Sequence, residues 1–170
     1  MKQYFAMFAA YNQWANARIY DAAAQLEQAE FERNVGAFFG SMMATLNHVL
    51  VGDRIWMKRF TGDGAAPKSL DEILFRDLGG LWAARQAEDQ RIIDWVGGLA
   101  EKDLTGRFSY ITVTDMRNVS QRLAPAMTHF FNHQTHHRGQ AHAILTILGK
   151  PSVVLDMALF QRTEDGRIYA

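Results

Sequence analysis

The residues best suited to chemistry in this sequence are histidines, and most of them fall in one short stretch. The segment 130–145, FFNHQTHHRGQAHAIL, holds four of the six histidines of a chain that has no cysteine. His133 and His137 are four residues apart, so on a helix they project from one face, about 40° apart and one turn removed. Two imidazoles at this spacing can reach one metal ion. The spacing makes this segment a candidate half of a metal site.

A metal ion held by one helix alone would lack ligands, so a second helix must contribute. His48 is distant in sequence from all the other histidines and lies in a segment with a helical pattern. His48, His133 and His137 together would make a three-histidine site with an open coordination position. An open position is typical of catalytic rather than structural metal sites.

The other histidines have different interpretations. His129 extends the same helical face by one turn, and is a further ligand, a partner that orients a ligand, or an ordinary core residue. A fourth ligand at His129 would close the site and favour a structural role. His136 and His142 lie off this face and are expected to be outside the site. Because core histidines are commonly just hydrogen-bonded, a helical protein without metal stays an alternative on spacing alone.

Four helical segments would have to position these residues. Apolar side chains recur at helical spacing in four ranges: 2–29, 41–60, 70–96 and 120–148. Ser69 and Glu72 fit a capping box for the third helix, and Gly149 followed by Pro151 predicts the end of the fourth. The segment 106–119, rich in Thr, Val, Ile, Tyr and Phe, predicts a β-hairpin or another extended excursion. The simplest all-α arrangement is a single-domain four-helix bundle over residues 1–170, with this excursion before the fourth helix.

Composition argues against several classes of function. Lys plus Arg and Asp plus Glu both number 18, so the chain has no net charge to attract nucleic acid or an anionic membrane. No apolar run reaches the length of a membrane span, and polar residues interrupt the N-terminal segment where a signal peptide would be continuous. We therefore expect a cytoplasmic protein with no nucleic-acid or membrane partner.

Four motifs in this order resemble the DinB/YfiT-like superfamily of small bacterial helical-bundle proteins: YNQWAN (11–16), LNHVLVGDRIW (46–56), NHQTHHRGQ (132–140) and GKPSVVLDMALF (149–160). This damage-inducible family is distinct from the polymerase that shares its name. The resemblance implies a four-helix bundle, often dimeric, with a divalent metal on His48, His133 and His137. Zinc and nickel are the metals usual in relatives, and three imidazoles suit either.

The resemblance also draws attention to polar residues near the histidines. Asn12 falls within the apolar stripe of the first helix, where it would hydrogen-bond either a ligand or a metal-bound water, or else the backbone. Gln140 is a second candidate partner of a ligand. Arg138 is expected to be structural, paired with one of two carboxylates, Asp53 or Asp156.

Some relatives act on low-molecular-weight thiols such as bacillithiol and mycothiol. A metal with an open position can bind a thiol as thiolate, because coordination lowers the thiol pKa. This chain has no cysteine, so any thiol must arrive with the substrate. The resemblance thus implies a homodimeric, metal-dependent thiol S-transferase acting on a small molecule.

Two alternatives stay open. In a metal-dependent hydrolase a metal-bound water is the nucleophile and usually needs a carboxylate base. Gln134 stands where an H-E-x-x-H motif has its glutamate, which disfavours this reaction, although Asp53 is a more distant candidate base. The other alternative is a non-catalytic, stress-related dimeric bundle that binds metal and acts through partners.

Overall fold

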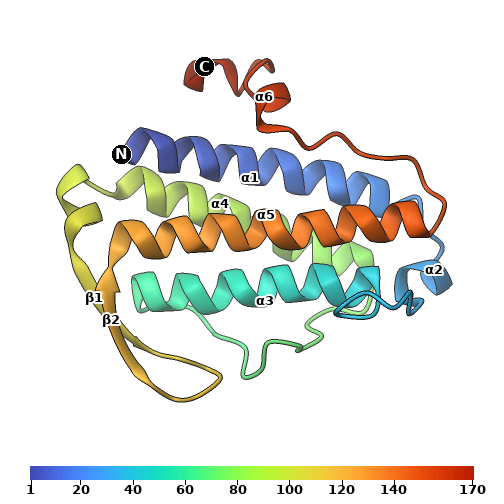
Figure 1. The fold of residues 1–170 in the computed structure, drawn as a ribbon, viewed down its shortest axis with the longest axis horizontal. Coiled ribbons are helices and arrows are strands. Elements are labelled where there is room, and N and C mark those ends of the chain that lie inside the picture. The colour runs from blue at the N-terminus through green and yellow to red at the C-terminus, as the bar shows by residue number, and fades with distance from the viewer.

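Four long helices make up most of the molecule, a computed structural model that describes residues 1–170. They are α1 Lys2–Ala23, α3 Met42–Thr61, α4 Leu78–Gly98 and α5 Leu123–Ile147. Helices α1 and α3 each lie beside both α4 and α5, so every long helix has two long neighbours (Figure 1). The expectation of a mainly helical protein is confirmed. No helix combines the length and apolar character that a membrane span requires.

Short elements connect and flank these helices. They are the helices α2 Gln28–Glu32 and α6 Met157–Phe160 and the 3₁₀ turns Glu101–Thr105 and Arg167–Tyr169. The predicted first helix over 2–29 was too long, because the chain turns after Ala23 before it enters α2. The C-terminal segment packs back on α1, where the Tyr11 hydroxyl donates to the Leu155 carbonyl at 2.6 Å.

Local sequence explains where the long helices begin and end. The Ser41 hydroxyl accepts from the backbone N–H of Ala44 at the start of α3, as an N-cap should. Helix α5 ends at Ile147, and Gly149, two residues later and shortly before Pro151, has a φ of 75° that favours glycine. The predicted end of the fourth helix is therefore confirmed.

The predicted third helix over 70–96 is wrong in its first part, since α4 begins only at Leu78. The side chain of Asn47, on α3, binds the backbone of the segment just before α4 instead. Its Oδ1 accepts from the N–H groups of Leu74 and Phe75 at 2.8 and 3.0 Å, and its Nδ2 donates to the Phe75 carbonyl. These bonds hold the segment in a non-helical path along α3, so no capping box forms at its start.

The excursion before the fourth helix is a β-hairpin, as the sequence allowed. Strand β1 Arg107–Ile111 pairs antiparallel with β2 Asn118–Arg122. Its aromatic residue Tyr110 packs against Trp56 of α3, with ring centres 5.4 Å apart. The hairpin therefore covers one end of the α3–α5 pair (Figure 1).

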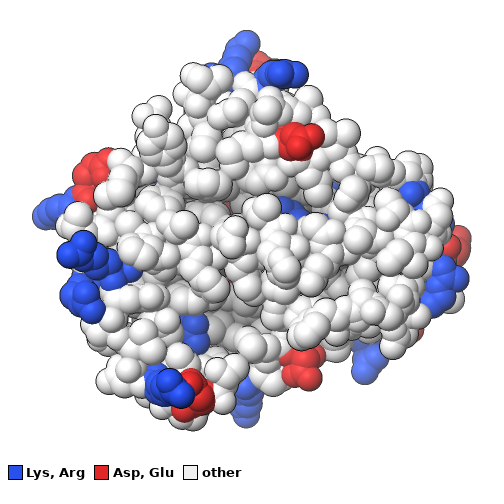
Figure 2. Space-filling model, viewed as in Figure 1, with Lys and Arg blue, Asp and Glu red and all other residues white.

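The surface has no large area of one charge on the face shown in Figure 2. Basic and acidic side chains are interspersed there, and most of them lie near its margin. This distribution agrees with the balanced composition of 18 basic and 18 acidic residues.

Candidate metal centre

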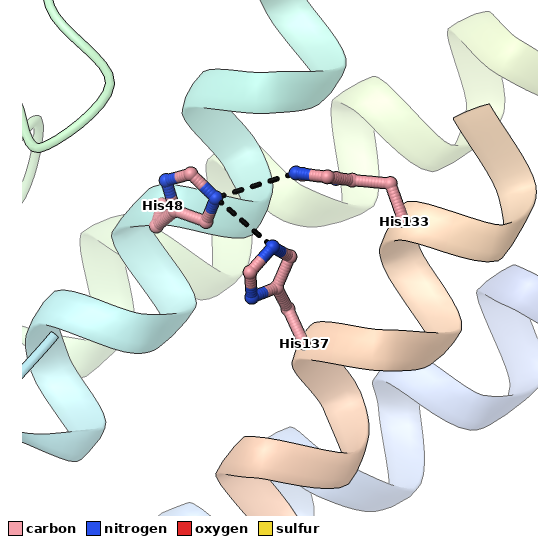
Figure 3. A group of neighbouring side chains, drawn as sticks. All are labelled: His48, His133 and His137. Atoms are coloured by element: carbon pink, nitrogen blue, oxygen red, sulfur yellow. Dashed lines mark hydrogen bonds between the residues drawn. The ribbon is translucent and has the colours of Figure 1, made fainter. Parts of the chain in front are cut away.

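Three histidines from two helices meet in one place. His48 of α3 and His133 and His137 of α5 turn their rings toward one another (Figure 3). The Nε2 atom of His48 lies 3.3 Å from that of His133 and 3.2 Å from that of His137. Zinc–nitrogen bonds of about 2.0–2.1 Å in a tetrahedral site place the nitrogens roughly 3.3–3.4 Å apart. The three histidines therefore form a group that could hold one metal ion, and no fourth His, Asp or Glu side chain joins it.

Hydrogen bonds orient two of these rings. The Nδ1 atom of His48 lies 2.7 Å from the carbonyl oxygen of Leu70, and that of His137 lies 2.8 Å from Oε1 of Gln140. Both oxygens only accept, so each Nδ1 carries the proton and donates it. The Nε2 lone pairs are then free for a metal. Gln140, a candidate partner from the sequence, thus contacts one of the three histidines directly.

The surroundings keep all three rings neutral at pH 7. Burial lowers the pKa of His133 to about 3, assisted by the neighbouring histidines. Burial also lowers the pKa of His137 to about 4, although the bond to Gln140 opposes this shift. The pKa of His48 is lowered by burial too, against the bond to the Leu70 carbonyl. Neutral imidazole is the form that binds metal ions.

Close packing fixes the rings from two further sides. The ring of Phe39 stacks on that of His48, with centres 3.9 Å apart. On the other side, a Cβ atom at Gly52 would lie 2.8 Å from Cε1 of His133. The missing side chain of Gly52, one turn after His48 on α3, therefore makes room for the His133 ring. Sequence reasoning missed this role of Gly52.

The remaining histidines lie outside the group. His129 is exposed to solvent, and its ring packs against that of Trp56, with ring centres 5.1 Å apart. His136 is exposed, and Nε2 of His142 lies 2.9 Å from the Ser152 hydroxyl. The structure thus places His129 beside the three-histidine group without making it a fourth member.

Asn12 contacts buried charged residues instead of the histidines. Its Nδ2 donates to Asp89 at 3.1 Å and its Oδ1 accepts from Arg138. Asp53 lies in the same buried layer, paired with Arg85 at 2.5 Å. The expected pairing of Arg138 with Asp53 or Asp156 was therefore wrong. So was the ligand-orienting role considered for Asn12, because its amide is satisfied within this layer.

Asp53 is not placed to act as a base at the histidines. Burial raises its pKa to about 6, with the charge of Arg85 opposing the shift, so it is ionised and paired at neutral pH. The buried charges separate two apolar clusters of the core, one around Ile19, Leu50 and Ile144 and the other around Met57, Ile92 and Phe130.

Comparison with known proteins agrees with the motifs. The sequence model of the DinB family matches residues 1–167. The chain belongs to the DinB family. It is also similar to Protein DinB of Bacillus subtilis (strain 168), with 24% identity over 158 residues that cover 88% of this chain and 89% of that protein. The resemblance seen in the motifs is thereby confirmed over nearly the whole chain.

A cavity of about 410 Å³ in this DinB-family protein reaches one of the three histidines, His133. It lies between α3, α5 and the hairpin, and is lined by aromatic, aliphatic and hydroxyl side chains together with His129, His133 and Arg59. No carboxylate lines it. Its volume is within the range of small-molecule sites, so a ligand in the cavity would have direct access to His133.

Proposed function

We propose that this DinB-family protein is a metal-dependent enzyme that transfers a low-molecular-weight thiol to a small electrophilic molecule. The observation that carries the proposal is the convergence of three neutral imidazole Nε2 atoms beside a cavity. His48, His133 and His137 would hold a divalent transition metal, zinc or nickel, within a four-helix bundle. Because no fourth protein ligand joins them, a coordination position would be free for substrate.

When bound, such an ion would supply Lewis acidity that lowers the pKa of a coordinating thiol. The chain itself contributes orientation and apolar contact surface. The Leu70 carbonyl and Gln140 hold the Nδ1 protons of two rings, and Trp56 and Tyr110 offer an aromatic wall to the substrate. In the transfer, the substrate sulfur bonds to the electrophilic carbon. The leaving group departs with its electron pair, and the thiol proton passes to solvent.

Two observations favour this reaction over the alternatives. A hydrolase would need a base near the site, yet no carboxylate lines the cavity and Asp53 is paired with Arg85 in the core. A purely structural metal site would be closed by a fourth protein ligand, and His129, the candidate for that role, lies outside the group. The absence of cysteine also fits an enzyme whose thiol comes with the substrate.

The test is a thiol-conjugation assay with the zinc- or nickel-loaded protein. Small thiols are mixed with the fluorogenic electrophile monochlorobimane, and the rate is compared with the spontaneous reaction. We expect a rate above the spontaneous one that is lost in His133→Asn. Nickel-loaded protein that accelerates no conjugation and shows no thiolate charge-transfer absorption with any thiol would contradict the proposal and favour the non-catalytic, stress-related alternative.

Family resemblance further supports a homodimer. Sedimentation velocity of the purified chain tests this, with a mass near twice 19.3 kDa as the expected result. A monomer at micromolar concentration would contradict it.

A further inference from the structure

One cation in the cavity has no acidic partner. Arg59 lies on α3 seven residues after Gly52, which is about 10 Å along the helix from the level of His133. Its guanidinium carbon sits 4.6 Å from the ring centre of Trp56 and 4.4 Å from that of Tyr110. Its one hydrogen bond is a long contact of 3.4 Å to the Ile111 carbonyl. Two aromatic rings therefore hold the guanidinium in place while most of its N–H groups stay free.

The surroundings of Arg59 offer no compensating charge. No salt bridge involves Arg59, although five other arginines of the chain have one. The single acidic residue of the hairpin, Asp115, is paired with Arg117 at 2.7 Å. The cavity therefore has the charge of one half-buried guanidinium, which an anionic ligand would complement.

We propose that Arg59 binds a carboxylate of the substrate, so that the enzyme acts on small molecules with a carboxylate at one end and the reacting group at the other. The direction of the reacting end toward His133 rests on the proposed function; the carboxylate site itself does not. A single guanidinium fork matches one carboxylate through two parallel hydrogen bonds. The aromatic and aliphatic wall of the cavity would contact the apolar part of such a molecule between its two ends.

The experiment compares two probes of the same shape, 4-phenylbutyrate and its neutral amide. Their affinities for the metal-free protein are measured by NMR chemical-shift titration, so that no metal can bind the carboxylate. We expect the wild type to prefer the carboxylate by about tenfold or more, which is typical of a charge-assisted hydrogen bond. Arg59→Met should remove the preference, and Arg59→Lys should keep part of it. Arg54→Met is the matched control, because Arg54 lies on the same helix but outside the cavity and pairs with Glu88.

An equal affinity of the wild type for acid and amide would overturn the inference, and so would a preference that survives in Arg59→Met. Metal content of the same wild-type sample after zinc loading tests the proposed function separately, so the two failures are distinguishable. A further pair of probes, 6-mercaptohexanoate and hexanoate, tells which substrate carries the carboxylate. If the zinc-loaded protein binds 6-mercaptohexanoate more tightly than hexanoate, the carboxylate belongs to the thiol substrate. If it binds both equally, the carboxylate belongs to the electrophile.

Discussion

Gly52→Ala should weaken metal binding without unfolding the protein. The new Cβ would lie 2.8 Å from Cε1 and 3.4 Å from Nδ1 of His133, whereas carbon atoms in contact are normally about 3.5–4.0 Å apart. The ring must therefore move by roughly 0.7 Å or more, beyond the ~0.5 Å within which a site tolerates displacement. We expect zinc affinity, measured by competition with a chromogenic chelator, to fall about 10- to 100-fold, as for other changes that misplace a ligand.

Opposing effects should limit the loss of stability of the metal-free Gly52→Ala protein to about 2 kcal/mol or less. Alanine favours a helix interior by about 1 kcal/mol over glycine, while crowding costs about 1–3 kcal/mol. Gly139→Ala is the control. A Cβ at Gly139, on α5, would meet nothing within 4 Å. This variant should keep zinc affinity. Wild-type affinity in Gly52→Ala would refute the assignment of His133 as a ligand.

Four further variants, one of them a control, test the site and its surroundings. Because burial lowers the pKa of His133 to about 3 against an unfolded value of about 6.5, the unfolded chain binds more protons between these values. The free energy of unfolding of the metal-free protein should therefore fall as pH drops below about 6.5, and it should fall less in His133→Asn. The raised pKa of Asp53 has the opposite effect on stability, but this effect is the same in both proteins. Asp53→Asn should lower the free energy of unfolding, measured by urea denaturation, by about 3 kcal/mol, because it removes a counter-charge of buried Arg85. The control Asp115→Asn, in an exposed ion pair, should lower it by less than about 1 kcal/mol. Asn47→Ala should lower the free energy of unfolding by about 1–2 kcal/mol. It should also weaken zinc binding, because it releases the segment before α4, whose Leu70 carbonyl orients the His48 ring.

Local signals in the sequence were sufficient to predict several features of the fold and of the site. The i, i+4 spacing of His133 and His137 predicted that both face the same way, and Gly149 predicted the end of α5. The β-rich composition of 106–119 predicted a hairpin or another extended excursion, and the structure has the hairpin. Each of these features depends on residues close together in the chain, where helix periodicity and turn chemistry apply.

Contacts between distant residues could not be predicted in the same way. Ser69 and Glu72 have the spacing of a capping box, but Asn47 of another helix holds the following backbone. Asn12 has its partners 77 and 126 residues away, so its polar position in an apolar stripe indicated only that some partner exists. The carbonyl that orients His48 belongs to Leu70, and a backbone group has no signature in residue type.

Binding of one metal ion by the three histidines can be measured directly. The most direct measurement is elemental mass spectrometry of protein purified without a metal-affinity tag, for the wild type and for His48→Asn and His133→Asn, with circular dichroism to verify folding. We expect about one zinc or nickel ion per wild-type chain and none in either folded variant. A wild type that takes up no metal after incubation with zinc and nickel, or variants that retain it, would show that the three histidines are not a metal site.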